Sequence, residues 1–85
     1  MTGTELLEKR ERCGLTQDQL ARYFRVSRTS IWRRETGKVP ILRTNEIQAK
    51  TLSTDNKELY SWIMSLPKEE RKSIWRRQRN FSRES

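Results

Sequence analysis

The sequence predicts an all-α protein, a compact bundle of four to six short helices. Apolar residues recur at steps of three and four, as Leu20 and Phe24 do, which places them on one side of a helix. Thr16 and Gln19 have the spacing of a capping box, in which a hydroxyl and a side-chain amide satisfy backbone N–H groups at a helix start. Glycine or proline stands where several of these segments begin or end.

The first helix is expected from about Thr4 to Cys13. Thr2 and Glu5 offer a capping-box spacing near its start, and Gly14 closes its end. Its inward side is formed by Leu6, Leu7, Arg10 and Cys13. Cys13, the one cysteine of the chain, is interpreted as a small buried hydrophobe rather than a reactive thiol.

Two further short helices, joined by a tight turn, are expected next. The capping box at Thr16 predicts that the second helix begins at Gln17. Ser27 can cap the third helix, which is expected over about 28–36, and Gly37 suits the left-handed conformation that often follows a helix end.

The third helix has two different faces. Ile31 and Glu35 lie one turn apart and point together toward the interior. The opposite face is cationic with one aromatic ring, and it carries Arg28, Thr29, Trp32, Arg33 and Thr36. This face is the kind of surface that can lie in a DNA groove.

A fourth helix is expected from Ile41 or Leu42 to Leu52, after a loop that Pro40 favours. Its apolar positions are Leu42 or Ile41, Ile47, Ala49 and Leu52. A fifth helix, over about 56–65, would be capped by Thr54 or Asp55 and carries the apolar stripe Leu59, Trp62, Ile63 and Leu66.

A sixth helix is expected to begin at Pro67, which suits a first helical position. Glu69 and Glu70 fall in its first turn, and its later part is rich in arginine, an order that the helix dipole favours. Its apolar edge is narrow.

The positive charge is concentrated in two blocks. The net charge is +8, with seven Lys or Arg against one Glu over 22–43 and seven against three over 68–85, while the rest of the chain is slightly acidic. Clustering of this kind indicates a polyanionic partner.

The absence of His and of a Cys cluster argues against a zinc site, and nothing in the sequence suggests a cofactor or an enzyme, since there is no Gly-rich phosphate loop. With no secretory signal and no long apolar run, a cytoplasmic protein without a membrane partner is expected, in a bacterium or encoded by a phage and associated with the nucleoid.

The segments GLTQDQLARYF, VSR, SI and RRETGK, between Gly14 and Lys38, resemble the Xre-like helix-turn-helix of phage repressors and Cro proteins. The resemblance covers roughly 6–52 and implies a lambda-repressor-like fold that binds double-stranded DNA. It implies base contacts by Arg28, Thr29 and Arg33 and a phosphate contact by Gln17.

The resemblance also implies an ion pair between Arg10 and Glu35 that ties the first helix to the third. The alternative is that Arg10 is a solvent-exposed arginine with no structural role. Two positions depart from the family pattern. Arg25 stands where glycine is usual, so a positive backbone angle there is either absent or adopted at a cost of about 1 kcal/mol. Arg34 stands where an apolar residue is usual, so its stem is expected along the core with its charge outward.

Further contacts to DNA can be assigned from residue chemistry. Arg28 and Arg33 suit guanine O6 and N7, and the Thr29 methyl suits thymine, so a GC-containing half-site is expected. Trp32 either contacts thymine methyls or a sugar, or folds back on neighbouring arginines by cation–π attraction. Additional phosphate contacts are expected from Arg22, Arg25, Lys38 and Arg43, the last of which has plain solvent exposure as an equal alternative.

Residues 1–54 are predicted to form the DNA-binding domain and 55–85 a C-terminal helical extension with a basic tail. The extension is interpreted as a homodimer interface, anchored by Trp62, Ile74, Trp75 and Phe81. Its alternative is an intramolecular lid over a small core, and the tail can add DNA backbone contacts or remain disordered.

The leading hypothesis is a Cro-like repressor or autoregulator that binds an inverted-repeat operator as a homodimer. The alternative is an antitoxin whose C-terminal segment folds on a toxin partner. Non-specific or RNA binding ranks below both. The operator sequence, the choice between activation and repression, and the genetic context are not determined by the sequence.

Overall fold

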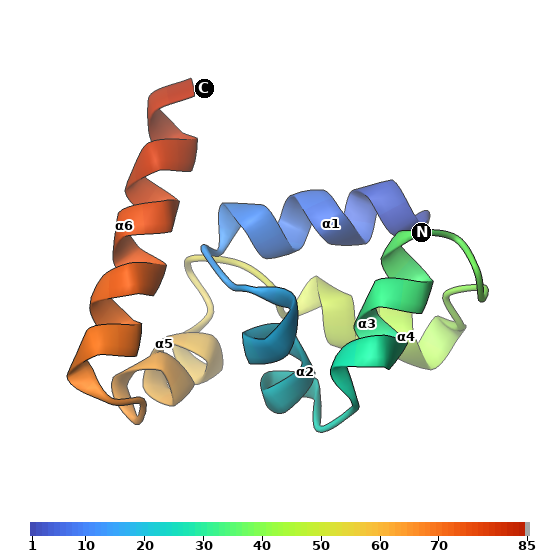
Figure 1. Cartoon of the computed structure of the whole chain (residues 1–85), viewed down its shortest axis with the longest axis horizontal. Coiled ribbons are helices and arrows are strands. Elements are labelled where there is room, and N and C mark those ends of the chain that lie inside the picture. The colour runs from blue at the N-terminus through green and yellow to red at the C-terminus, as the bar shows by residue number, and fades with distance from the viewer. Residues whose placement is uncertain (85) are drawn as a thin grey trace.

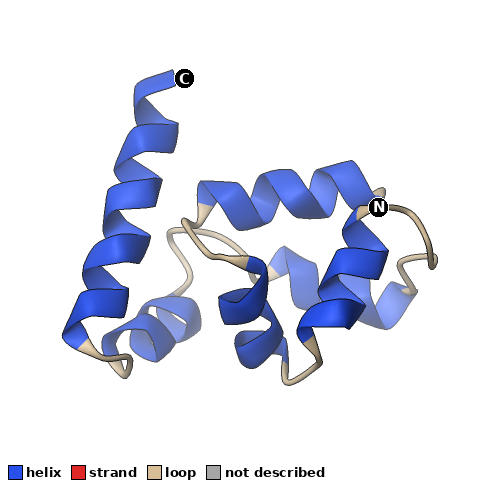
Figure 2. Ribbon diagram, in the orientation of Figure 1, coloured by secondary structure: helices blue, strands red, loops and turns tan. Residues whose placement is uncertain are grey.

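The computed structural model describes the backbone of residues 1–84 and the side chains of residues 1–78. That part of the chain is all-α, as predicted, with loops as the connections between helices (Figures 1 and 2). The helices are α1 (Gly3–Arg12), α2 (Gln17–Phe24), α3 (Arg28–Glu35), α4 (Arg43–Lys50), α5 (Lys57–Met64) and α6 (Lys68–Glu84).

Capping explains where the first three helices begin. Thr2 and Thr16 each form a capping box, which confirms both predictions: the Thr16 hydroxyl accepts from the backbone N–H of Gln19 at 3.1 Å, and Gln19 Oε1 accepts from that of Thr16 at 3.0 Å. The Ser27 hydroxyl accepts from the backbone N–H of Ser30 at 3.1 Å at the start of α3. Each side chain satisfies a backbone donor that has no acceptor within its helix.

The start of α5 differs from the prediction. Asn56, rather than Thr54 or Asp55, is the cap, since its Oδ1 accepts from the backbone N–H of Glu58 at 2.8 Å. The amide nitrogen of Asn56 also donates to the carbonyl of Thr51 at 2.6 Å. An amide satisfies a donor and an acceptor at once with two different atoms, whereas the carboxylate of Asp55 has no hydrogen to donate.

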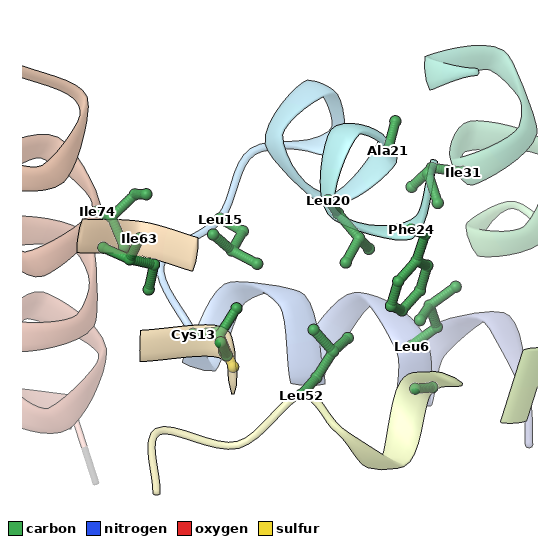
Figure 3. Packing of buried hydrophobic residues seen from close by; sticks show 12 residues of the cluster. Leu6, Cys13, Leu15, Leu20, Ala21, Phe24, Ile31, Leu52, Ile63 and Ile74 are labelled. Carbon is green, nitrogen blue, oxygen red and sulfur yellow. The ribbon is translucent and has the colours of Figure 1, made fainter. Parts of the chain in front are cut away.

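A single hydrophobic core joins all six helices (Figure 3). Its buried members are Leu6, Cys13, Leu15, Leu20, Ala21, Phe24, Ile31, Ala49, Leu52, Leu59, Ile63 and Ile74. The core therefore runs across the predicted boundary at residue 54. As predicted, Cys13 is buried, and burial raises the pKa of its thiol to about 11, which keeps it protonated and unreactive.

The expected apolar side of α4 is only partly correct. Ala49 and Leu52 are buried, but Ile47 is 58% exposed and Leu42 is 61% exposed. Ile41 packs against the core instead of Leu42. Ile47 and Ala49 are two residues apart and so point in different directions on a helix. The smaller side chain, that of Ala49, is the one buried in the core.

The last helix is held against the loop between α1 and α2 by side-chain donors. Arg77 Nε donates to the carbonyl of Gly14 at 2.6 Å, and its Nη2 donates to Gln19 Oε1 at 2.7 Å. The amide nitrogen of Gln78 donates to the carbonyl of Cys13 at 2.8 Å. Loss of solvent around the guanidinium, with Arg10 nearby, lowers the pKa of Arg77. The extension is thus an integral part of the fold.

We expect Gly14→Ala to destabilise the protein more than Gly37→Ala. Both glycines have positive φ, +74° and +79°, so alanine costs about 1–2 kcal/mol at either site. A Cβ at Gly14 would also collide with the carbonyl oxygen of Ile74 in α6, whereas one at Gly37 meets no atom within 4 Å. The Gly14 variant should therefore lose on the order of 3 kcal/mol in urea unfolding. Equal losses at the two positions would show that α6 does not dock there.

Candidate nucleic-acid interface

The candidate surface is the outer face of α3, which lies near one end of the molecule (Figure 1). Ile31 is fully buried and anchors the helix in the core. On the other side, Arg28, Thr29 and Arg33 are exposed and Trp32 is 43% exposed. One helix therefore exposes two guanidinium groups, a threonine methyl group and an indole to solvent.

The start of α2 completes this surface. Gln17 lines a pocket of about 270 Å³ together with Arg28, Thr29 and Trp32. The N–H of Gln19 is capped by Thr16, whereas those of Gln17 and Asp18 have no acceptor within the helix and lie at the positive end of its dipole, which favours an anion at this corner. The side-chain amide nitrogen of Gln17 donates to Glu35 Oε1 at 3.0 Å, which holds the side chain beside α3.

An ion pair fixes the angle between α1 and α3. Arg10 Nε donates to Glu35 Oε2 at 2.7 Å, and Arg10 Nη2 donates to Glu35 Oε1 at 3.2 Å. Arg10 Nη1 also donates to the carbonyl of Leu15 at 2.9 Å. The side chains are 12% and 3% exposed, so the two parallel hydrogen bonds act in a place with little water.

Close approach of the backbones supports the same arrangement. A Cβ at Gly3, the first residue of α1, would collide with the carbonyl oxygens of Arg34 and Glu35 at the end of α3. Glycine therefore allows α1 to lie directly against α3. Together with the ion pair, this contact sets the direction in which the outer face of α3 points.

The turn between α2 and α3 adopts the left-handed conformation at Arg25, with φ 59° and ψ 43°. Of the two possibilities left open by the sequence, the positive angle is the one adopted. We expect Arg25→Gly to raise the unfolding free energy by about 0.5 kcal/mol, because relief of the left-handed strain exceeds the added freedom of the unfolded chain. Urea unfolding measures this, and a loss of stability would contradict it.

Trp32 has a cation partner, although it is a lysine rather than an arginine. The ammonium of Lys38 lies 5.8 Å from the centroid of a Trp32 ring. This cation–π contact orders the loop after α3 and places a third positive charge at the rim of the surface. Lys38, Arg25 and Arg43, all expected to contact phosphate, are exposed.

Arg22, another expected phosphate contact, is engaged with acidic side chains. It donates to Glu70 of α6 at 2.6 Å and lies 3.4 Å from Asp18. The hydrogen bond from Arg22 holds the pKa of Glu70 below its ordinary value. Arg22 therefore links the helix pair to α6, a contact that the sequence did not indicate.

Arg34 does not lie as predicted. Its Nη1 is buried and has no hydrogen-bond partner among the described residues, so its charge is not directed wholly outward. The carbonyl oxygen of Arg34 lies against Gly3 of α1, so Arg34 stands where two helices pack closely.

The expected dimer anchors are distributed differently from the prediction. Ile74 is fully buried in its own chain, so it is not available to a second copy, and this expectation was wrong. Trp62 is half-buried and packs edge-on against Tyr23, with ring centroids 5.4 Å apart. Trp75 is 39% exposed. The side chain of Phe81 lies outside those that the structure describes.

Gln19 and Arg77 were not singled out from the sequence as a linked pair. The signal for Gln19 was its place in the capping box, and its oxygen accepts from both Thr16 and Arg77. Arg77 had no signal beyond its position on a basic helix, because its acceptors, Gln19 Oε1 and the carbonyl of Gly14, lie 58 and 63 residues earlier in the chain.

A family model described as a helix-turn-helix domain matches residues 3–51, more than half of the chain. This protein belongs to the helix-turn-helix domain family. Membership supports DNA binding and agrees with the all-α fold. Searches of curated proteins and of solved structures each found no match. Among the described residues of this helix-turn-helix protein, no helix has the length and apolarity needed to span a membrane.

Proposed function

We propose that this helix-turn-helix protein is a sequence-specific, double-stranded DNA-binding transcriptional regulator of the Cro-like repressor type. The supporting observation is the contrast across α3, where Ile31 is fully buried and Arg28, Thr29, Trp32 and Arg33 stand exposed. An exposed helix face with two arginines suits the guanine edge in the major groove, while the start of α2 and the cations Arg25, Lys38 and Arg43 suit phosphates.

Selection from a random duplex library tests this function. We expect enrichment of a GC-containing inverted repeat, followed by a footprint at such a repeat in DNA flanking the gene for this protein. If a dimer makes about eight phosphate contacts, the log–log salt slope should be near −7. Equal affinity for selected and scrambled duplexes would contradict sequence-specific regulation.

The antitoxin alternative has less support. An antitoxin tail that folds on its toxin would keep apolar side chains free until the partner binds. Here Leu59, Ile63 and Ile74 of the C-terminal helices are buried in the protein's own core. The repressor proposal needs no further protein partner for these helices to be ordered.

A homodimer completes the proposal, with the interface moved from the C-terminal helices α5 and α6 to the segment after α3. Val39, Leu42 and Ile47 are 37%, 61% and 58% exposed. Two recognition helices must lie about 34 Å apart to read half-sites one turn apart. Figure 1 shows α6 at one end of the molecule and α3 toward the other, so an interface through α6 would place both protomer bodies between the two copies of α3 and hold them too far apart.

Sedimentation equilibrium tests this interface. Leu42→Glu/Ile47→Glu should be monomeric and should lose preference for the inverted repeat over a single half-site. Tyr60→Glu/Met64→Glu, which also charges two exposed apolar residues but on α5, is the matched control and should stay dimeric. The reverse result would return the interface to the C-terminal helices.

A further inference from the structure

The side of α6 that faces away from the core carries a row of three exposed cations. Lys68, Lys72 and Arg76 stand at every fourth residue, so they follow one another along the helix with a rise of about 6 Å between neighbours. Trp75, which is 39% exposed, falls on the same side of the helix. Ile74 lies on the opposite side and is fully buried. We call the three cations and the indole the outer face of α6.

The positive charge of the outer face is not neutralised within the described part of the protein. None of the ion pairs among the described side chains involves its three cations. Of the two acidic residues in the first turn of α6, Glu70 is engaged by Arg22 and Glu69 is exposed, so three cations stand against one free carboxylate. A row of cations beside an indole suits a strand of DNA, because its phosphates attract the cations and its sugars can pack on the ring.

The outer face of α6 and the exposed face of α3 point away from each other. Figure 3 shows Ile74 entering the core from α6 and Ile31 entering it from α3, at opposite sides of the cluster. Each exposed face lies across its own helix from the buried isoleucine, so the two faces are turned to different sides of the molecule. A straight duplex seated on α3 therefore leaves the outer face of α6 free for a different molecule.

The proposed homodimer also leaves this surface open. Its interface is formed by Val39, Leu42 and Ile47, and none of these residues belongs to α5 or α6. A dimer on its inverted repeat would thus present two outer faces of α6, one from each protomer, both directed away from the DNA that α3 reads.

We propose that the outer face of α6 binds the phosphate backbone of a second DNA duplex, so that the protein joins its operator to another segment of DNA. This inference rests on the proposed function, because the operator is the first of the two duplexes. Any duplex can serve as the second, since contacts to phosphate and sugar carry no direct sequence information.

Capture of a labelled duplex on beads tests this inference. The beads carry the selected inverted repeat, the protein is loaded to saturation, and a fluorescent duplex of scrambled sequence is added. We expect the parent to retain the fluorescent duplex at about 50 mM salt and to release it as the salt concentration rises. Trp75→Ala should load equally and retain less of it at unchanged charge.

Lys68→Gln/Lys72→Gln should load on the beads as the parent does but retain less of the fluorescent duplex. The salt slope of retention should be shallower by about 1.8 per protomer, which is about a tenfold smaller decline between 50 and 200 mM. Lys50→Gln/Lys57→Gln is the matched control, since it removes the same charge from exposed positions on α4 and α5, and it should retain as much as the parent.

Three outcomes would overturn the inference while leaving the proposed function intact. They are a loaded parent that retains no second duplex at low salt, equal retention by the parent and Lys68→Gln/Lys72→Gln, and competition by polyglutamate that is as effective as competition by unlabelled duplex of equal charge. The last result would assign the outer face to an acidic protein. Failure to select any sequence for the beads would instead refute the proposed function itself.

Discussion

Replacement of both Arg28 and Arg33 with alanine is expected to abolish sequence-specific DNA binding without unfolding the protein. Both side chains are exposed on α3, so neither contributes packing that the fold requires. A bidentate contact from arginine to guanine is worth about 1–3 kcal/mol, so two of them account for a loss of between about 30-fold and about 3 × 10⁴-fold per half-site. Titration of the selected duplex by fluorescence anisotropy measures this loss.

The control for this double variant removes two cations elsewhere. Lys50→Ala/Lys57→Ala lowers the net charge by the same amount and should keep its preference for the selected sequence. The circular dichroism spectrum of each variant should match that of the parent. Unchanged discrimination between selected and scrambled duplexes by the Arg28→Ala/Arg33→Ala variant would end the assignment of α3 as the recognition helix.

The second large effect is expected at Glu35, whose carboxylate serves two donors. In Glu35→Ala, Arg10 keeps its buried charge without a carboxylate to balance it, and the amide of Gln17 loses its acceptor. Removal of one member of a buried pair costs about 3–5 kcal/mol. Domains of this size have about 5–15 kcal/mol in total, so a large fall in the urea midpoint is expected.

A double replacement separates the effect of the unpaired charge from that of the lost packing. Arg10→Met/Glu35→Met should recover most of the stability lost by Glu35→Ala, because it leaves no unpaired charge in the interior. A loss below about 1 kcal/mol in Glu35→Ala would show instead that Arg10 escapes to water. In that case the ion pair would not set the angle of α3.

Local features of the sequence were sufficient to locate the helices. Thr16 and Gln19 act within four residues of each other, and a capping box depends on little beyond its own turn. The exposed face of α3 was also visible, because Ile31 marks the buried side of a short helix and thereby defines the opposite side. The cap of α5 was less accessible, since the choice of Asn56 depended on the carbonyl of Thr51 in the preceding loop.

The sequence by itself determined the all-α class, the helix starts and the cationic face of α3, because helical periodicity and capping involve neighbours one turn apart. The tertiary structure alone decided that Ile74 belongs to the protein's own core and that Arg22 pairs with Glu70, 48 residues away. Contacts over such separations depend on how helices pack in three dimensions, and several packings are compatible with the same apolar stripes. For that reason only the structure shows which side of α6 packs on the core and which side is exposed.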